Sequence, residues 1–375
     1  MELSSEDSFR LNVLLASKPQ AIRIDEGKMT VHGLVPKGES VVRLHPNARP
    51  DQYLRRVREL ISGHVLGSPG GYPVYLKRWT RMGQMRDESL AQLLLLGEPE
   101  AVVAAVCSPG LTDELARRAW WAMEDAENAR RMLCSPAIVS GSMGPVLAAY
   151  LIDYLPFETE SERIMESVRL VLQPGVMGAE ERDELWRKSA RKQTYLVGFL
   201  QALPDDLPDP EPQRELAPAL AAAVEDLAEQ GNACARLLRR AASGPGQTWL
   251  RTVAAVLAKP PSQDVVTTTF NCMRDYFAPL RPEGDPNLSI EDLIGEAADF
   301  ADPASPDPAV AECLQRSPEL APEVSAMRVL SGLGYGVIRP VLPDPTALGT
   351  LMRRKLVPVI DPIQGCIARL RGATG

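Results

Sequence analysis

Aromatic side chains are scarce in this chain of 375 residues, where Phe, Trp and Tyr together make up 5%. Leu and Ala are abundant instead. Aromatic and β-branched residues favour strands, whereas Leu and Ala favour helices. The composition therefore predicts packed helices rather than sheets, and the 45% of apolar residues are enough to form hydrophobic cores.

Long hydrophobic runs are also missing. No stretch reaches 18 uncharged apolar residues, which is about the length that a membrane-spanning helix needs. The N-terminal stretch MELSSEDSFRLNVLLA is acidic, and its apolar run is too short for a signal peptide. The six cysteines are scattered and form no CxxC pair, a distribution that indicates reduced thiols rather than a disulfide framework. We therefore expect a cytoplasmic protein without a membrane segment.

Motifs of catalysis and cofactor binding are missing as well. The sequence contains no P-loop, HExxH, GxSxG or GxGxxG motif. The three histidines, His32, His45 and His64, have no cysteine nearby, which argues against a zinc site. The glycine run GLGYG at 332–336 has the wrong spacing for nucleotide binding and predicts a tight turn. We expect no cofactor and no metal, although a catalytic triad of distant residues would leave no local signature.

Turn and helix signals along the chain predict a mainly α fold. Residues 21–44 contain three short strand-like segments separated by turn residues, and Pro50 opens a helix as a first-turn proline. Helical patterns follow from residue 87 onward, and Pro218 opens a long helix that ends at Ser243. The last 45 residues hold five prolines, so only short helices are expected there.

The same signals suggest how the chain is divided. A weak repeat at a spacing of 70 residues, in which Asp-Glu-Leu at 113–115 recurs at 183–185, favours HEAT-like layers of helical hairpins. The acidic, proline-rich stretch PDDLPDPEP at 204–212 indicates a boundary. We expect a basic α+β module at 1–86, a helical domain at 87–203 and a second helical segment at 214–375. The last two could also form one body.

Charge is distributed unevenly along the chain. Residues 1–86 carry 14 Lys and Arg against 8 Asp and Glu, although the whole protein has a net charge of −8. Within 43–86, nine bases face only two acids and alternate with aromatic residues, a pattern that can bind phosphates and stack bases. The alternative is an internal contact with the acidic helical body, which we favour because the whole chain is negative. The residues that would bind a macromolecule are Arg55, Arg58, His64, Lys77, Arg78, Trp79 and Arg81.

Two adjacent tryptophans lie beside three acids in ARRAWWAMEDAEN at 116–128. As one helix over 113–133, this segment places Trp120 and Trp121 on two flanks of a narrow apolar stripe, so we expect both rings to be mostly buried. Glu124 and Glu127 could converge on a metal, but no histidine follows a glutamate by three residues as in di-iron bundles. We favour a core helix supported by the ion pairs Asp113–Arg117, Glu114–Arg118 and Glu127–Arg131.

Cys366 lies near the end of the chain in DPIQGCIARLRG. Arg369, one helical turn away, would lower the thiol pKa if the two side chains meet, and a sulfur-carrying cysteine near a C-terminus is chemically sensible. Free cysteine is also among the most buried residue types. We favour a packed thiol that reacts slowly.

Four segments resemble the DsrS family, the S protein encoded with the dissimilatory sulfite reductase (Dsr) clusters of sulfur-oxidising bacteria. They are HVLGSPGGYPVYLKRWTRMGQ, LLLLGEPEAVVAAV, GLTDELARRAWWAMEDAENARRML and VGFLQALPDDLP, and the likeness covers the chain to about residue 210. The resemblance implies a cytoplasmic protein of Dsr-type sulfur oxidation and carries over no catalytic residue. We expect an accessory or regulatory protein that binds a protein partner. Two alternatives are sulfur transfer by a thiol and RNA binding by the basic module.

Overall fold

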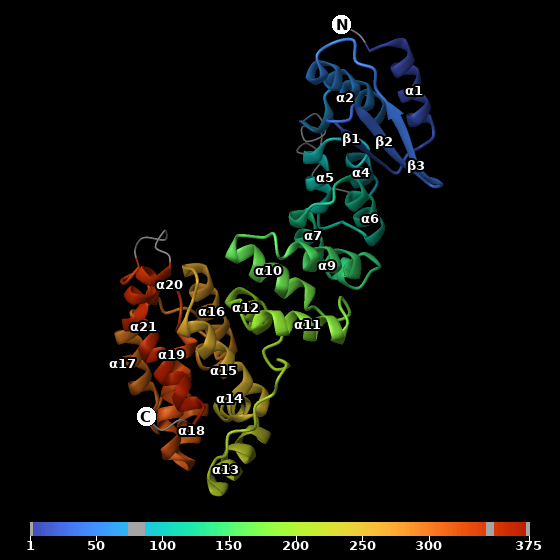
Figure 1. Ribbon diagram of the computed structural model, residues 1–375. Coiled ribbons are helices and arrows are strands. Elements are labelled where there is room, and N and C mark those ends of the chain that lie inside the picture. Colours follow the sequence, from blue (N-terminus) through green and yellow to red (C-terminus); the bar gives the residue numbers. More distant parts are fainter. Residues whose placement is uncertain (1–2, 74–86, 343–348, 373–375) are drawn as a thin grey trace. The chain divides into compact units, whose positions relative to one another are not determined.

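The computed structural model describes residues 3–73, 87–342 and 349–372. These residues are mainly helical, with one small antiparallel sheet near the N-terminus, which confirms the predicted fold class (Figure 1). Contacts group the chain into two compact units, Met1–Pro156 with Gln173–Met177, and Phe157–Leu172 with Gly178–Gly375. The three-part division at 86 and 204–212 stays a prediction. No described helix has the length and apolarity needed to cross a membrane.

The first unit combines the sheet with a series of short helices. Its strands are β1 (Ala21–Asp25), β2 (Thr30–Val35) and β3 (Gly38–Arg43). Its helices are α1 (Ser5–Ala16), α2 (Pro50–Leu66), α4 (Asp87–Leu93), α5 (Pro99–Val106), α6 (Asp113–Ala122), α7 (Ala126–Leu133), α8 (Pro136–Val139) and α9 (Met143–Tyr154).

All the secondary-structure elements described in the second unit are helices. Its first helices are α10 (Ser161–Val171), α11 (Ala179–Ser189), α12 (Gln193–Ala202), α13 (Pro218–Glu229), α14 (Ala233–Ala242), α15 (Gly244–Ala258) and α16 (Gln263–Tyr276). The remaining ones are η1 (Ala278–Leu280), α17 (Ile290–Phe300), α18 (Pro308–Arg316), η2 (Pro318–Leu320), α19 (Ala321–Ser331), α20 (Tyr335–Ile338) and α21 (Gly349–Leu370).

The strand order of the sheet is β1-β2-β3. Side chains alternate between the two faces of each strand, and this alternation determines which face is buried. Val31 pairs with Ile24 on one side and Val42 on the other, so that apolar side chains collect on one face. This face packs with Leu11 of α1 and Val57 of α2 in one buried cluster. The three strands expected within 21–44 and the helix start at Pro50 are confirmed.

The helix expected over 113–133 is two helices, so that prediction is wrong. The Asp125 carboxylate accepts hydrogen bonds from the backbone N–H groups of Glu127 (2.9 Å) and Asn128 (3.2 Å), and it therefore caps α7. The Asn128 side chain in turn donates to the carbonyl oxygen of Met123, at the end of α6. An N-cap needs non-helical backbone, so a helix cannot continue through Asp125.

The helix expected from Pro218 to Ser243 is also divided, into α13 and α14. Gly231 has a φ of 97°, which ends α13. The Asn232 side chain accepts a hydrogen bond from the backbone N–H of Ala235 at 3.0 Å and caps α14. Both breaks share one cause, because a short Asx side chain competes with the helix for backbone N–H groups.

The long helix α21 contradicts the expectation of only short helices after residue 330. It keeps Pro358 and Pro362 in its interior, where each removes one backbone hydrogen bond. One face of the helix is nevertheless buried along its whole length, and α21 packs against α15 and α19. The continuous burial of apolar side chains outweighs the two lost hydrogen bonds. The buried residues are Met352, Leu356, Val359, Ile360, Ile363, Ile367 and Leu370.

Candidate functional site

The tandem tryptophans hold the first unit together. Trp120 is 8% exposed, which confirms its predicted burial, and meets Tyr150 edge-to-face at 4.8 Å between ring centroids. Trp121 is half-buried. The Arg23 guanidinium of β1 lies 4.7 Å from the centre of its ring and donates a hydrogen bond to its carbonyl oxygen. The two rings thus join α6 to α9 and to the sheet.

The acids around the tryptophans bind arginines or cap backbone. Glu127 lies between Arg130 and Arg131, at 3.0 and 2.9 Å, and Glu124 is exposed. Asp113 does not pair with Arg117, which corrects that prediction; its carboxylate accepts hydrogen bonds from Ser142 and Met143. In the described part of the chain, no group of three or more His, Cys, Asp or Glu side chains could hold a metal.

Glu114 shows the strongest electrostatic effect among these acids. Its carboxylate pairs with Arg117 at 2.7 Å and with Arg118 at 2.9 Å. The hydrogen bonds from Arg117, and then those from Arg118, lower the pKa of Glu114 to about 2. The carboxylate is therefore ionised and occupied at neutral pH, and it cannot act as a general acid.

The basic window is only partly described. Arg55 pairs with Glu59 at 3.3 Å on its own helix, and Arg58 pairs with Glu26 near the turn after β1. Both acids belong to the same module as the arginines. His64 is exposed on α2. The other members of the window, Lys77, Arg78, Trp79 and Arg81, lie outside the described residues, so a macromolecule-binding surface there stays a prediction.

Cys366 lies half-buried on α21. Burial raises the pKa of its thiol to about 11, which is the opposite direction from the effect expected of Arg369. The carbonyl oxygen of Arg369 instead accepts a hydrogen bond from Arg214 at 3.0 Å. Since the thiolate is the nucleophilic form, this environment supports a packed thiol rather than a sulfur carrier.

We expect alkylation of Cys366 in the folded protein at pH 7 to be at least about 20-fold slower than that of an ordinary exposed thiol. The lower thiolate fraction outweighs the greater nucleophilicity of a more basic sulfur, and burial slows access further. A time course with iodoacetamide, followed by peptide mass spectrometry, measures this rate, with the exposed Cys107 and Cys134 as internal references. Modification of Cys366 as fast as these two, or a persulfide on it, would contradict the expectation.

An open groove of about 690 Å³ runs between α15 and α21. Arg353, Val357, Ile360 and Gln364 follow one another at helical spacing along one wall, and Val357 is 46% exposed. Small and apolar residues of α15 and the turn after it form the other wall. The lining residues are Ala254, Leu257, Ala258, Pro260, Thr350, Arg353, Arg354, Val357, Ile360, Asp361 and Gln364.

Hydrogen bonds between the two walls fix the groove. The Gln364 amide donates to the carbonyl oxygen of Ala254 at 2.9 Å, and Arg353 donates to the carbonyl oxygen of Pro260 at 3.4 Å. Arg354 is exposed and has no acid partner among the described residues. The groove therefore combines an apolar floor with cationic side chains at one end.

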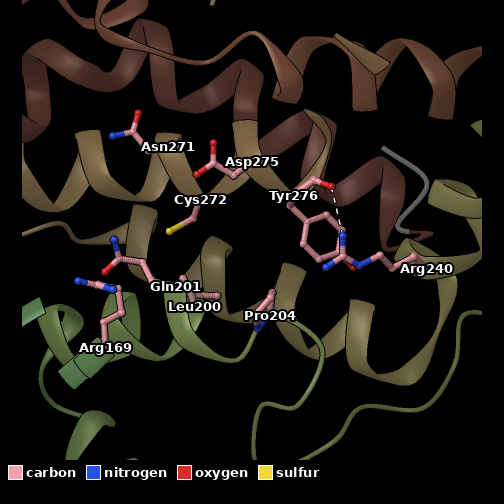
Figure 2. A pocket seen from close by; sticks show the side chains of 9 residues that line it. All are labelled: Arg169, Leu200, Gln201, Pro204, Arg240, Asn271, Cys272, Asp275 and Tyr276. Atoms are coloured by element: carbon pink, nitrogen blue, oxygen red, sulfur yellow. Dashed lines mark hydrogen bonds between the residues drawn. The ribbon is translucent and has the colours of Figure 1, made fainter. Parts of the chain in front are cut away.

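A second hollow, a pocket of about 290 Å³, lies where four helices of the second unit meet (Figure 2). Helix α10 contributes Arg169, and α14 contributes Arg240. Figure 2 shows Cys272 between the Arg169 and Gln201 pair and the Arg240 and Tyr276 pair. The full lining is Arg169, Leu200, Gln201, Pro204, Arg240, Asn271, Cys272, Asp275 and Tyr276.

One wall of this pocket is a stack of three flat groups. The Arg240 guanidinium lies 3.8 Å from the ring centre of Tyr276, and the other face of that ring stacks on Trp249 at 4.1 Å. Two hydrogen bonds of 2.7 Å join Arg240 to Asp205. Burial raises the pKa of Tyr276 well above its usual range, so its hydroxyl is protonated at neutral pH.

Sequence reasoning missed both hollows. The groove had one visible signal, the run Arg353-Arg354-Lys355, but nothing in the sequence showed that α15 would lie beside it. The pocket draws its residues from four helices and has no local signature. Searches of family models, curated proteins and solved structures found no significant match for the chain.

Proposed function

We propose that this protein is a non-enzymatic accessory or regulatory protein of Dsr-type sulfur oxidation, which acts in the cytoplasm by binding a partner protein. The groove between α15 and α21 is the observation that carries the binding role. The resemblance of the N-terminal segments to DsrS supports the pathway. Helical layers offer extended surfaces for protein binding.

The chemistry of the groove selects its occupant. Arg353 and Arg354 lie at one end, and among the described residues of the lining Asp361 is the one acid. A cationic end on a chain of net charge −8 attracts acidic segments and sets the direction in which they bind. The apolar floor fits the hydrophobic face of a helix. The occupant is therefore an acidic, amphipathic helix of a Dsr protein.

The double variant Arg354→Glu, Val357→Asp tests this proposal. Both side chains are exposed, so the changes remove charge complementarity and the apolar contact without disturbing the core. The control is Val146→Asp on α9, because Val146 is 47% exposed, much like Val357. We expect the groove variant, made in the chromosomal gene, to slow oxidation of stored sulfur and to lose a Dsr protein on affinity purification, while the control keeps both.

Unchanged sulfur oxidation and unchanged recovery of Dsr proteins in the groove variant would contradict the proposal. Recovery of RNA by the wild type, lost at high salt, would instead favour the RNA-binding alternative through the basic module. A persulfide on a cysteine of the purified protein would favour sulfur transfer.

A further inference from the structure

Several polar groups of the pocket in Figure 2 have no partner in the part of the chain that the structure describes. Arg169 is half-buried and pairs with no acid there. The Tyr276 hydroxyl is buried and makes no hydrogen bond within that part. The amides of Gln201 and Asn271 also face no protein partner in it. Of these groups only the Tyr276 hydroxyl is buried, since Arg169 and Asn271 are half-buried and Gln201 is exposed. Buried polar groups are normally satisfied, and a hollow on which unpaired polar groups converge is a typical place for a ligand.

The pocket is preformed. Arg240 is held in place by its paired hydrogen bonds to Asp205 and by a further one to the carbonyl oxygen of Tyr276. The Tyr276 ring is clamped between Arg240 and Trp249. These side chains are therefore ordered before a ligand binds, so binding does not cost the conformational entropy of immobilising them.

Charge determines which ligands fit. Arg169 provides a planar set of N–H donors that matches a carboxylate. Asp275, the one acid among the described residues of the lining, is exposed and lies 3.5 Å from Arg274, so it opposes an anion only weakly. Leu200, Pro204 and the edge of the Tyr276 ring supply apolar surface for a short carbon skeleton.

No covalent chemistry is expected in the pocket. Burial raises the pKa of the Cys272 thiol to about 12, so at neutral pH the sulfur is protonated and a poor nucleophile. We propose that the pocket reversibly binds a small carboxylate, which Arg169 holds while its carbon skeleton rests against Leu200, Pro204 and the edge of the Tyr276 ring. This second site is independent of the groove and goes beyond the proposed protein-binding role.

Malate and benzoate are suitable probes, one with a polar and one with an apolar body. We expect at least one of them to raise the melting temperature of the full chain in a saturable way, with a Kd measured by titration calorimetry. Arg169→Gln should weaken that Kd about ten-fold or more, because a charge-assisted hydrogen bond is lost. The matched control is Arg163→Gln on the same helix, where Arg163 pairs with Glu160 at 3.1 Å.

A second variant, Asn271→Asp, places a negative charge in the lining and should weaken binding even if Arg169→Gln fails to fold. Absence of saturable binding by both probes would overturn the proposal. Equal weakening by the Arg169 and Arg163 variants would show that the carboxylate binds elsewhere. Equal binding of inorganic phosphate, lost in Arg169→Gln, would overturn the assignment to carboxylates.

Discussion

Glu296→Gln is expected to lower the free energy of unfolding of the second unit by about 3–5 kcal/mol. Glu296 on α17 pairs with Arg281 at 2.6 Å and with Arg328 at 2.5 Å. The two arginines are only 3% and 7% exposed. Glutamine keeps the volume but removes the charge, so that two buried guanidinium groups share the single remaining carboxylate of Glu283.

Denaturant unfolding followed by circular dichroism measures this loss. The control is Glu184→Gln, since Glu184 pairs with Lys188 in an exposed position on α11 and the loss of this pair should leave stability nearly unchanged. Equal effects of the two variants would show that the buried pair adds nothing specific. The same comparison at low salt and high salt should leave the Glu296 effect nearly unchanged, because buried pairs are screened little.

The ion pairs of Glu296 with Arg281 and Arg328 also predict how the stability of the folded protein depends on pH. Burial alone raises the pKa of Glu296, but the hydrogen bonds from Arg328 and Arg281 outweigh it, and the pKa lies below its ordinary value. A carboxyl whose pKa is lower in the folded state stabilises the protein above its unfolded pKa. This contribution is lost as the pH falls through the folded pKa. Acid unfolding of Glu296→Gln should therefore be less steep than that of the wild type.

Asp7→Ala is expected to destabilise the first unit by about 3 kcal/mol, since it removes a buried carboxylate that accepts hydrogen bonds from Tyr53 and from the backbone of His45. The Asp7 side chain is fully buried on α1. Its carboxylate accepts hydrogen bonds from the Tyr53 hydroxyl and from the backbone N–H of His45 at 2.8 Å. These contacts join α1, α2 and the segment after β3, and they close the core of the small sheet.

The neighbouring variant Glu6→Ala is the control, because Glu6 is exposed and pairs only with Arg10 one turn away in the described structure. Thermal unfolding of the two variants measures the difference, and a similar change in both would contradict a special role for Asp7. Burial raises the pKa of Asp7, but hydrogen bonds from Tyr53 and His45 outweigh it and lower the pKa overall. Its stabilising effect is thus lost as the pH falls through that lowered value.

Local sequence determined the elements whose signals lie within a few residues. Alternating apolar residues and turn residues placed the strands between 21 and 44, and the fixed φ of Pro50 placed the start of α2. The abundance of Leu and Ala was enough to predict a mainly α protein. These features depend on backbone preference and on side-chain periodicity, which act over short range.

Tertiary structure decided where the long helical patterns end. Asp125 and Asn232 are compatible with helix or cap by sequence alone, and each acts as a cap in the folded chain. In α21 the opposite happened, because burial against α15 and α19 keeps a helix through Pro358 and Pro362. Propensity differences are small compared with the free energy of burying a whole helix face.

The groove and the pocket depended on tertiary structure entirely. Arg169 and Tyr276 are separated by more than a hundred residues in the sequence and line the same hollow. Arg353 lies across the groove from Ala254 for the same reason. Such sites form when helices distant in sequence pack together, and the side chains that meet there carry no spacing by which they can be recognised in the sequence.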